Sequence, residues 1–523
     1  MPLSDPTNLL PDAMVVTTTT GLITLALLAL APSLWRTQRT AVLTAAGIGL
    51  FALLIRLFAS WGPGDLAEAR RWDILYALQP ESRPGMALVP NLANLLSHLG
   101  IPSLWLYRGV GLTTGAMIAV LTFTAATVSQ LRKPWPVFAG LLVAAWPAHV
   151  HYSATGGYTT LGPLLFLLAW TLLRAETMAP IARLFLSSAL LTASVYARPE
   201  YPLLALAVLP LLLQPGWNLR MRLTFLGTFA VFVVSYLAVM GSTHGVALES
   251  TWADHARWLI WDLRVSPTFW LVLAFLGLGL STLDLWTRVS LGLGLIGLLV
   301  GYSMASEPNP LFGQWRYYVS MLPLFSLLAA GFLARFVPTQ RQGYVAIAVL
   351  LLSLAVYTPL WWQPADLQAD FQSLRQSAAT TQPGDLLLLS DRRAELHVGL
   401  DAMATSLLAL HLSSGRVQMA DRQHPDLPTD FGDQKVQSLE AWLDQGAPLP
   451  KGRRTLAWLG LTVQASTRQQ LAERVQLRRL FSENLRVSNT LPMAQTPCSR
   501  SQGQGLTLQP CLTTVGWYAL EPR

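Results

Sequence analysis

The chain contains an apolar run, AVLTAAGIGLFALLIRLFA (41–59), that leads almost directly into a charged one, GPGDLAEARRW (62–72). The apolar run has the length that a helix needs to cross a bilayer core of about 30 Å. The charged run places two carboxylates and two guanidinium groups behind a Gly-Pro-Gly turn. Charged residues beside a membrane helix are energetically costly and are rarely retained without a function. This junction therefore indicates a functional site at the membrane edge.

The composition is typical of a membrane protein. Hydrophobic residues make up 52% of the 523 residues, charged residues 12%, and the mean hydropathy is +0.41. A soluble domain carries roughly 25% charged residues. We expect a polytopic α-helical membrane protein with about 12 transmembrane helices. The predicted spans are 17–35, 41–59, 104–131, 135–150, 158–174, 180–197, 200–214, 222–241, 268–286, 288–305, 317–336 and 343–361.

The basic residues predict the orientation of these spans. The net charge is +8, and much of it lies in short loops, where it favours the cytoplasmic side rather than binding of nucleic acid. No Lys or Arg precedes Arg36, so we expect the first span to be retained with its N-terminus outside. One membrane topology is then consistent with the basic residues. It places the following on the cytoplasmic side: Arg36, Arg39, Arg132, Lys133, Arg174, Arg183, Arg220, Arg222, Arg288, Arg335 and Arg341.

The composition of the chain changes after residue 362 to that of a soluble domain. Residues 1–362 are the predicted transmembrane domain, whose first outer loop (60–103) carries two interfacial helices, 66–78 and 86–99. Residues 363–523 are predicted to form a small α/β domain outside the membrane. We expect helices at 366–380 and 467–477, and strands at 384–390, 454–461 and 516–520.

The two cysteines, Cys498 and Cys511, both fall in this C-terminal region. An even pair in an outward domain favours a disulfide, and two free thiols are the alternative. The chain has no Asn-X-Ser/Thr sequon, which favours a bacterial membrane over the endoplasmic reticulum. One GxGxxG match, 292–297, lies inside a predicted span, and we interpret it as chance or close helix packing.

Chemistry-bearing side chains gather in the predicted outer loops. They are Asp65, Glu68, Arg70 and Arg71 in the first loop, then His149, His151 and Tyr152, then Arg198 and Glu200, then His255, and finally Arg316 and Tyr317. Sugar transfer from a lipid phosphate needs this set. A carboxylate takes the proton from the acceptor, fixed cations hold the departing phosphate, and aromatic walls hold lipid and sugar. Arginine pairs bidentately with phosphate oxygens, which favours it as the cation.

The same motifs resemble the GT-C superfamily of polyprenyl-phosphate-dependent glycosyltransferases, including the bacterial aminoarabinose transferases and the protein O-mannosyltransferases. The resemblance covers nearly the whole chain. It rests on the order of Asp65, an interfacial helix, PAHVHYS (147–153), RPE (198–200), Arg316-Tyr317 with Pro323, PGD (383–385) and GWYAL (516–520). It implies a GT-C-like fold.

The implied activity is inverting transfer from a polyprenyl-phosphate sugar on the outer face. Asp65 is the expected base, and Arg198 and Arg316 are the expected phosphate clamp. The implied partners are the lipid-linked donor, membrane lipids, and an acceptor lipid, glycan or protein. The implied location is the bacterial inner membrane, with both termini and the site outside.

Several assignments have alternatives. Asp65 could act only as a helix N-cap, and Glu68 could bind a divalent cation with Asp65 or pair with Arg71. Arg56, inside the second span, is expected to snorkel outward or to contact a ligand. His149 and His151 are expected to make local hydrogen bonds rather than to bind a metal.

Two rival functions stay open. A flippase or transporter would place its charge near the bilayer midplane. A non-catalytic scaffold is the other alternative, because Leu66 follows Asp65 where many relatives have a second acid.

Overall fold

The computed structural model describes two compact units, one of helices up to Tyr357 and one of segments after it. The described residues are 20–30, 39–59, 103–146, 149–150, 153, 158–175, 179–197, 202–214, 217–240, 268–305, 315–357, 373–374, 376–382, 384–390, 430–431, 434–460, 463, 465–487 and 511–523.

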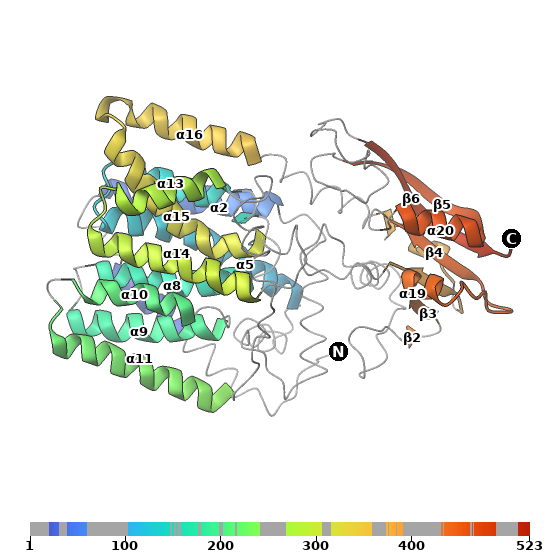
Figure 1. Ribbon diagram of the computed structural model, residues 1–523, viewed down its shortest axis with the longest axis horizontal. Coiled ribbons are helices and arrows are strands. Elements are labelled where there is room, and N and C mark those ends of the chain that lie inside the picture. The colour runs from blue at the N-terminus through green and yellow to red at the C-terminus, as the bar shows by residue number, and fades with distance from the viewer. Residues whose placement is uncertain are drawn as a thin grey trace. The chain divides into compact units, whose positions relative to one another are not determined.

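The first unit is a bundle of helices that lie side by side (Figure 1). They are α2 (Arg39–Ala59), α5 (Ser103–Val128), α6 (Trp135–Ala145), α8 (Tyr158–Arg174), α9 (Pro180–Ala197), α10 (Pro202–Leu212), α11 (Leu219–Met240), α13 (Thr268–Gly279), α14 (Leu285–Ala305), α15 (Trp315–Phe336) and α16 (Gln342–Tyr357). A short helix also covers Thr20–Leu30. Each predicted apolar run therefore contains a helix, which apolar segments favour because it satisfies the backbone internally.

Three of the described helices are long and apolar enough to cross a membrane: Thr40–Leu57, Gly109–Val128 and Val319–Phe336. The other described helices do not meet this criterion of length and composition, so the count of about 12 spans stays a prediction. Burial separates outer from inner helices. Leu43 and Leu50 on α2 are exposed, whereas Leu322 and Phe325 on α15 are fully buried. Apolar side chains on the outside of the bundle suit a lipid environment.

Glycines let the helices approach closely. A Cβ at Gly277 of α13 would meet the backbone carbonyl of Leu328 on α15, and a Cβ at Gly294 of α14 would crowd Ala207 and Leu324. Gly294 belongs to the GxGxxG match, so that motif serves helix packing, one of the two interpretations made from the sequence. Small residues at helix contacts are typical of membrane bundles.

The second unit contains a six-stranded sheet in the order β2-β3-β1-β4-β6-β5. Its elements are β1 (Leu386–Leu389), β2 (Asp430–Phe431), β3 (Gln434–Ser438), α19 (Leu439–Asp444), β4 (Thr455–Leu459), α20 (Ala465–Arg474), β5 (Gln476–Val487) and β6 (Cys511–Glu521). The strands β3, β1 and β4 run parallel, β6 pairs antiparallel with β4, and β5 pairs antiparallel with β6. Trp442, Leu443 and Leu471 of the two helices pack with the sheet's leucines in one apolar core.

The expected elements of this unit are partly correct. Strands occur within 384–390 and 454–461, and the closing strand is longer than expected, beginning at Cys511. The helix expected over 467–477 ends at Arg474, because Gln476 already belongs to β5. In the expected helix 366–380, Ser377–Thr380 form a 3-10 turn. The strands β2, β3 and β5 are not among the expected elements, because β2 is very short and the charged and polar residues of β3 and β5 hide the alternation that identifies a strand.

An ion pair fixes the start of the sheet. Gly384 has a φ of +86°, which a glycine adopts without strain, and it turns the chain into β1. The adjacent Asp385 accepts two hydrogen bonds from Arg454, Nε to Oδ1 at 3.0 Å and Nη2 to Oδ2 at 2.6 Å. This hydrogen bonding raises the pKa of Arg454 above its ordinary value. The pair therefore ties the first residue before β1 to the first residue before β4.

We expect Asp385→Asn to loosen this corner of the sheet. The amide keeps the size of the side chain but removes its charge, so the bidentate pair is lost from a side chain that is nearly buried. The expected cost is about 1–3 kcal/mol. Hydrogen exchange of the full-length protein should show faster exchange in β1 and β4. Asp444→Asn, at an exposed position of α19, is the matched control and should leave these rates unchanged. Equal rates in both variants would contradict the role of the pair.

Candidate functional site

Most of the predicted site residues lie outside the residues that the structure describes. These are Asp65, Glu68, Arg70, Arg71, His151, Tyr152, Arg198, Glu200 and His255. Arg316 and Tyr317 belong to the first turn of α15, but their side chains are not described. The described residues include no disulfide. Cys498 lies outside them and Cys511 begins β6, so the predicted pairing has no support from the structure.

The helix ends next to these residues belong to one end of the bundle. Residues at the ends of α5, α8, α10 and α15 line a common pocket, so the other ends of these helices point away from it. The predicted site residues follow α6 and α9 or begin α15, at helix ends remote from that pocket. The grouping of the predicted site residues stays a prediction.

A buried polar cluster occupies this end, centred on Arg56 near the end of α2. Arg56 is 0% exposed. Its Nε donates to Ser153 Oγ at 2.7 Å, and its Nη1 donates to the carbonyl oxygens of Ala52 at 2.8 Å and Ala144 at 3.0 Å. Its Nη2 donates to the Val143 carbonyl at 3.5 Å and lies 2.6 Å from His149 Nδ1. All five N–H groups of the guanidinium thus have acceptors.

The contact with Arg56 defines the protonation of His149. A guanidinium can only donate, so His149 Nδ1 must accept and the ring proton of a neutral imidazole is on Nε2. His149 is fully buried, and its Nε2 has no hydrogen-bond partner among the described residues. A buried donor without an acceptor is costly. The cluster therefore presents one unused N–H group, which suits an acceptor atom of a ligand or of a neighbouring segment.

Ser153 completes the cluster. Its hydroxyl donates to the His149 carbonyl at 2.6 Å while accepting from Arg56. The three side chains come from the second apolar run and from the PAHVHYS motif, which are far apart in the sequence. The sequence identified the motif but assigned no role to Ser153. The signal that could have found the cluster was an arginine inside an apolar span, since such residues usually have polar partners within the protein.

The expectation that Arg56 snorkels outward is wrong. Its guanidinium turns inward because the carbonyls at the end of α6 and the His149 ring satisfy it there, whereas snorkelling needs a route to water. Its described partners are all uncharged, so its positive charge is not neutralised by any described carboxylate. His149 is hydrogen-bonded within the protein, but its partner Arg56 is 93 residues away in the sequence and is not a local one. Within the described ranges no group of three metal-ligating side chains occurs.

No protein-family model matches the sequence, and no curated protein matches it significantly. Among solved structures, the chain is similar to ArnT from Cupriavidus metallidurans bound to undecaprenyl phosphate. The identity is 14%, the TM-score is 0.47, and the match covers 84% of this chain and 96% of that one. It is also similar to the arabinofuranosyltransferase AftD from Mycobacteria, with 16% identity, a TM-score of 0.45, and coverage of 92% of this chain and 40% of that one.

The identities and TM-scores of these two similar structures are too low to assign a residue role, substrate or activity to this chain.

We expect Gly115→Ala to disrupt the buried cluster. Gly115 lies on α5 directly against Ser153 and Arg56, and a Cβ there would overlap the Ser153 side chain and come within 2.8 Å of Arg56 Nε. The expected cost of overpacking is about 1–3 kcal/mol. Thermal unfolding of the purified protein should show a lower midpoint.

Gly109→Ala is the matched control for this change. It is on the same helix, and a Cβ there meets nothing within 4 Å, so its unfolding midpoint should not fall. If both variants lost stability equally, the cost would come from the helix and not from the cluster.

Proposed function

We propose that the protein is an integral membrane glycosyltransferase that uses a polyprenyl-phosphate sugar as donor and inverts the anomeric centre. The observation that carries this proposal is the buried Arg56 cation with the unused donor of His149, at the bundle end where the charged segment 62–72 follows α2. A fixed positive charge in a place with little water stabilises negative charge that develops nearby. Departure of a lipid phosphate develops such a charge.

In the proposed reaction Asp65 accepts the proton of the acceptor hydroxyl or amine. The acceptor atom attacks the anomeric carbon as the bond from that carbon to the phosphate oxygen breaks, and the phosphate leaves with the electron pair. Arg198 and Arg316 hold the phosphate oxygens, because guanidinium groups pair bidentately with them. Glu68, Arg70, Arg71, His151, Tyr152, Glu200, His255 and Tyr317 are proposed to line the substrate site.

Arg56 cannot serve as a phosphate ligand in this arrangement, because its five N–H groups already have acceptors within the protein. Its proposed role is positioning. It fixes the His149 ring with Nε2–H free, and it adds positive potential at the bundle end that carries the site. Metal dependence stays open, with Asp65 and Glu68 as the candidate ligands of a divalent cation.

The first test is Asp65→Asn. The amide cannot accept a proton at neutral pH, so we expect the variant to fold normally and lose activity about 100- to 10,000-fold. Transfer of sugar from a synthetic polyprenyl-phosphate donor measures this. Asp73→Asn, in the same segment, is the control and should transfer sugar at the wild-type rate. Wild-type activity of Asp65→Asn would remove Asp65 as the base.

His149 gives a second test. His149→Phe keeps a ring but removes both the acceptor for Arg56 and the free donor, so we expect kcat to fall about 10- to 100-fold with KM little changed. His149→Gln supplies an amide that can accept from Arg56 and also donate, and it should restore much of the rate. Equal loss in both variants, together with a lower unfolding midpoint, would indicate a purely structural role.

A flippase is the alternative function, because transporters also bury charged residues within the helical bundle, as this protein buries Arg56. Mass spectrometry of co-purifying lipids, combined with the transfer assay, separates the two. A bound polyprenyl-phosphate sugar that turns over on adding acceptor supports the transferase. The same lipid bound without turnover supports a flippase or a non-catalytic scaffold.

The location proposed for the site is the outer face of a bacterial inner membrane, with both termini outside. The residues after 362 would then lie in an oxidising compartment, where Cys498 and Cys511 can pair. Accessibility of single introduced cysteines to a membrane-impermeant reagent in whole cells tests this orientation.

A further inference from the structure

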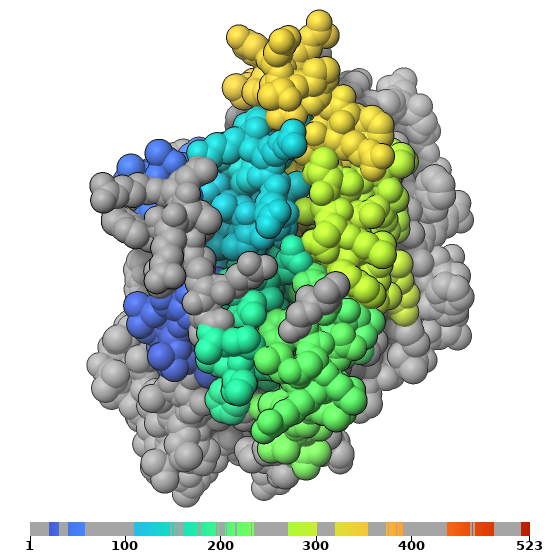
Figure 2. All heavy atoms as spheres, turned by 90° about the vertical axis from the view of Figure 1, so that its left-hand side faces the viewer, coloured from blue at the N-terminus to red at the C-terminus, as the bar shows by residue number. Residues whose placement is uncertain are grey.

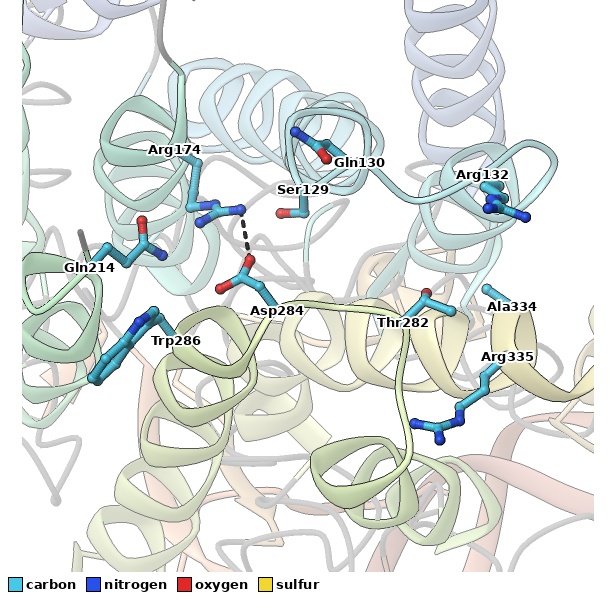
Figure 3. A pocket seen from close by; sticks show the side chains of 10 residues that line it. All are labelled: Ser129, Gln130, Arg132, Arg174, Gln214, Thr282, Asp284, Trp286, Ala334 and Arg335. Carbon is cyan, nitrogen blue, oxygen red and sulfur yellow. Dashed lines mark hydrogen bonds and ion pairs between the residues drawn. The ribbon is translucent and has the colours of Figure 1, made fainter. Parts of the chain in front are cut away.

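A polar pocket lies at the other end of the helical bundle, remote from the Arg56 cluster. It has a volume of about 840 Å³, and five helix ends contribute to it. Figure 2 views this end of the bundle directly. The lining residues are Ser129, Gln130, Arg132, Arg174, Gln214, Thr282, Asp284, Trp286, Ala334 and Arg335 (Figure 3).

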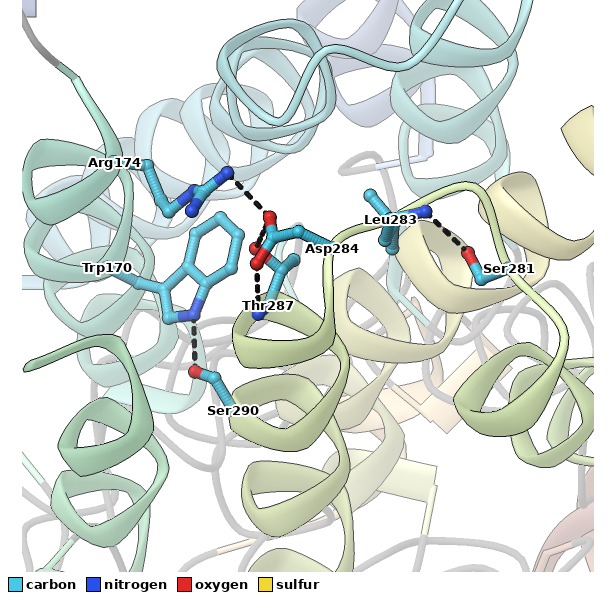
Figure 4. Close-up of polar contacts among 7 residues, drawn as sticks. All are labelled: Trp170, Arg174, Ser281, Leu283, Asp284, Thr287 and Ser290. Atoms are coloured by element: carbon cyan, nitrogen blue, oxygen red, sulfur yellow. Dashed lines mark hydrogen bonds and ion pairs between the residues drawn. The ribbon is translucent and has the colours of Figure 1, made fainter. Parts of the chain in front are cut away.

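The turn between α13 and α14 forms a fixed wall of this pocket. Asp284 caps α14, accepting from the Thr287 backbone N–H at 3.0 Å and from the Thr287 hydroxyl at 2.7 Å (Figure 4). Arg174 of α8 donates to the same carboxylate at 2.8 Å. The Ser281 hydroxyl accepts from the Leu283 N–H at 3.1 Å, which holds the turn in place. The wall is therefore held by hydrogen bonds within the protein and needs no ligand to form.

The charge of the lining is positive. Burial raises the pKa of Asp284, but hydrogen bonds from Thr287 and the attraction of Arg174 outweigh it, and the net pKa is below its usual value. Asp284 is therefore ionised at neutral pH and offsets Arg174. Arg132 and Arg335 lie across the pocket from this pair (Figure 3). Both are exposed, and neither has an ion pair among the described residues.

Three lining residues also present buried polar atoms that have no partner among the residues that the structure describes. They are Ser129 Oγ, Arg174 Nε and Gln214 Nε2, and each carries a hydrogen that it can donate. Ser129 is only 6% exposed. Native structures rarely leave buried donors unused. Unused donors and two uncompensated arginines around one cavity indicate a ligand that is an anion rich in hydrogen-bond acceptors.

We propose that this pocket binds a phosphate-bearing anion. Phosphate oxygens accept several hydrogen bonds at once and pair with guanidinium groups, which matches both the unused donors and the free arginines. The anion can belong to a phospholipid headgroup or be free phosphate. The position at the ends of apolar helices, where headgroups lie, favours the lipid. This site is separate from the proposed transferase site and does not depend on it.

The test compares wild-type protein with Arg132→Gln/Arg335→Gln, which removes the two free charges and leaves the Arg174–Asp284 pair intact. Full-length protein is placed in phosphatidylcholine nanodiscs, with or without phosphatidylglycerol, and separately titrated with inorganic phosphate. We expect phosphatidylglycerol to raise the unfolding midpoint of the wild type. We expect the double variant to bind it about tenfold or more weakly, as loss of charge-assisted hydrogen bonds implies.

Arg341→Gln is the matched control, because Arg341 is an exposed arginine from the η2 turn (Thr339–Arg341) after α15 and does not line the pocket. It should respond like the wild type. Stabilisation by inorganic phosphate that the double variant loses would identify the free ion as the ligand. The proposal fails if neither probe stabilises the wild type. It also fails if the double variant and Arg341→Gln respond alike, since the effect would then be general surface charge.

Discussion

The helical bundle depends on one constraint: inside an apolar bundle, each polar group must find its partner within the protein. Arg56 shows the constraint most clearly, because its guanidinium donates to carbonyls, a hydroxyl and an imidazole without reaching a described carboxylate. Hydroxyl groups follow the same rule on a smaller scale. Thr122 and Thr171 donate to the carbonyls four residues before them, at 2.8 Å and 2.6 Å. Trp170 donates to Ser290 across two helices at 2.8 Å.

Buried polar groups that do not meet this constraint indicate where a ligand could bind. The buried donors without a partner in the described part of the chain include His149 Nε2 at one end of the bundle, and Ser129 Oγ, Arg174 Nε and Gln214 Nε2 at the other. At both ends the unused donors stand beside arginine, so both ends are prepared for negative charge. The difference lies in access. Arg56 is enclosed and saturated, whereas Arg132 and Arg335 are exposed and free to bind.

The sequence predicted the helical elements well, because apolar runs of this length have few other structures available. It predicted β1 and β4 for a similar reason, since Leu386–Leu389 and Thr455–Leu459 are continuous buried strands. It failed for β5, whose sequence QLRRLFSENLRV pairs with β6 at the edge of the sheet and therefore tolerates charge. The direction of Arg56 could not be predicted either, because its acceptors are on segments about 90 residues away that no local pattern connects to it.

The separation between Arg56 and its partners also has a consequence for how the protein is made. Ser153 and His149 follow Arg56 by 97 and 93 residues, so α2 is synthesised well before the groups that satisfy its charge. An arginine at the centre of a membrane helix costs about 2.5–3.5 kcal/mol on insertion, and Arg56 costs less because it lies in the last turn of α2. On its own, α2 is therefore a weakened membrane segment during synthesis. The Arg56 guanidinium gains its distant acceptors only when α6 and the PAHVHYS motif arrive beside it, so the arrival of that motif completes the polar cluster.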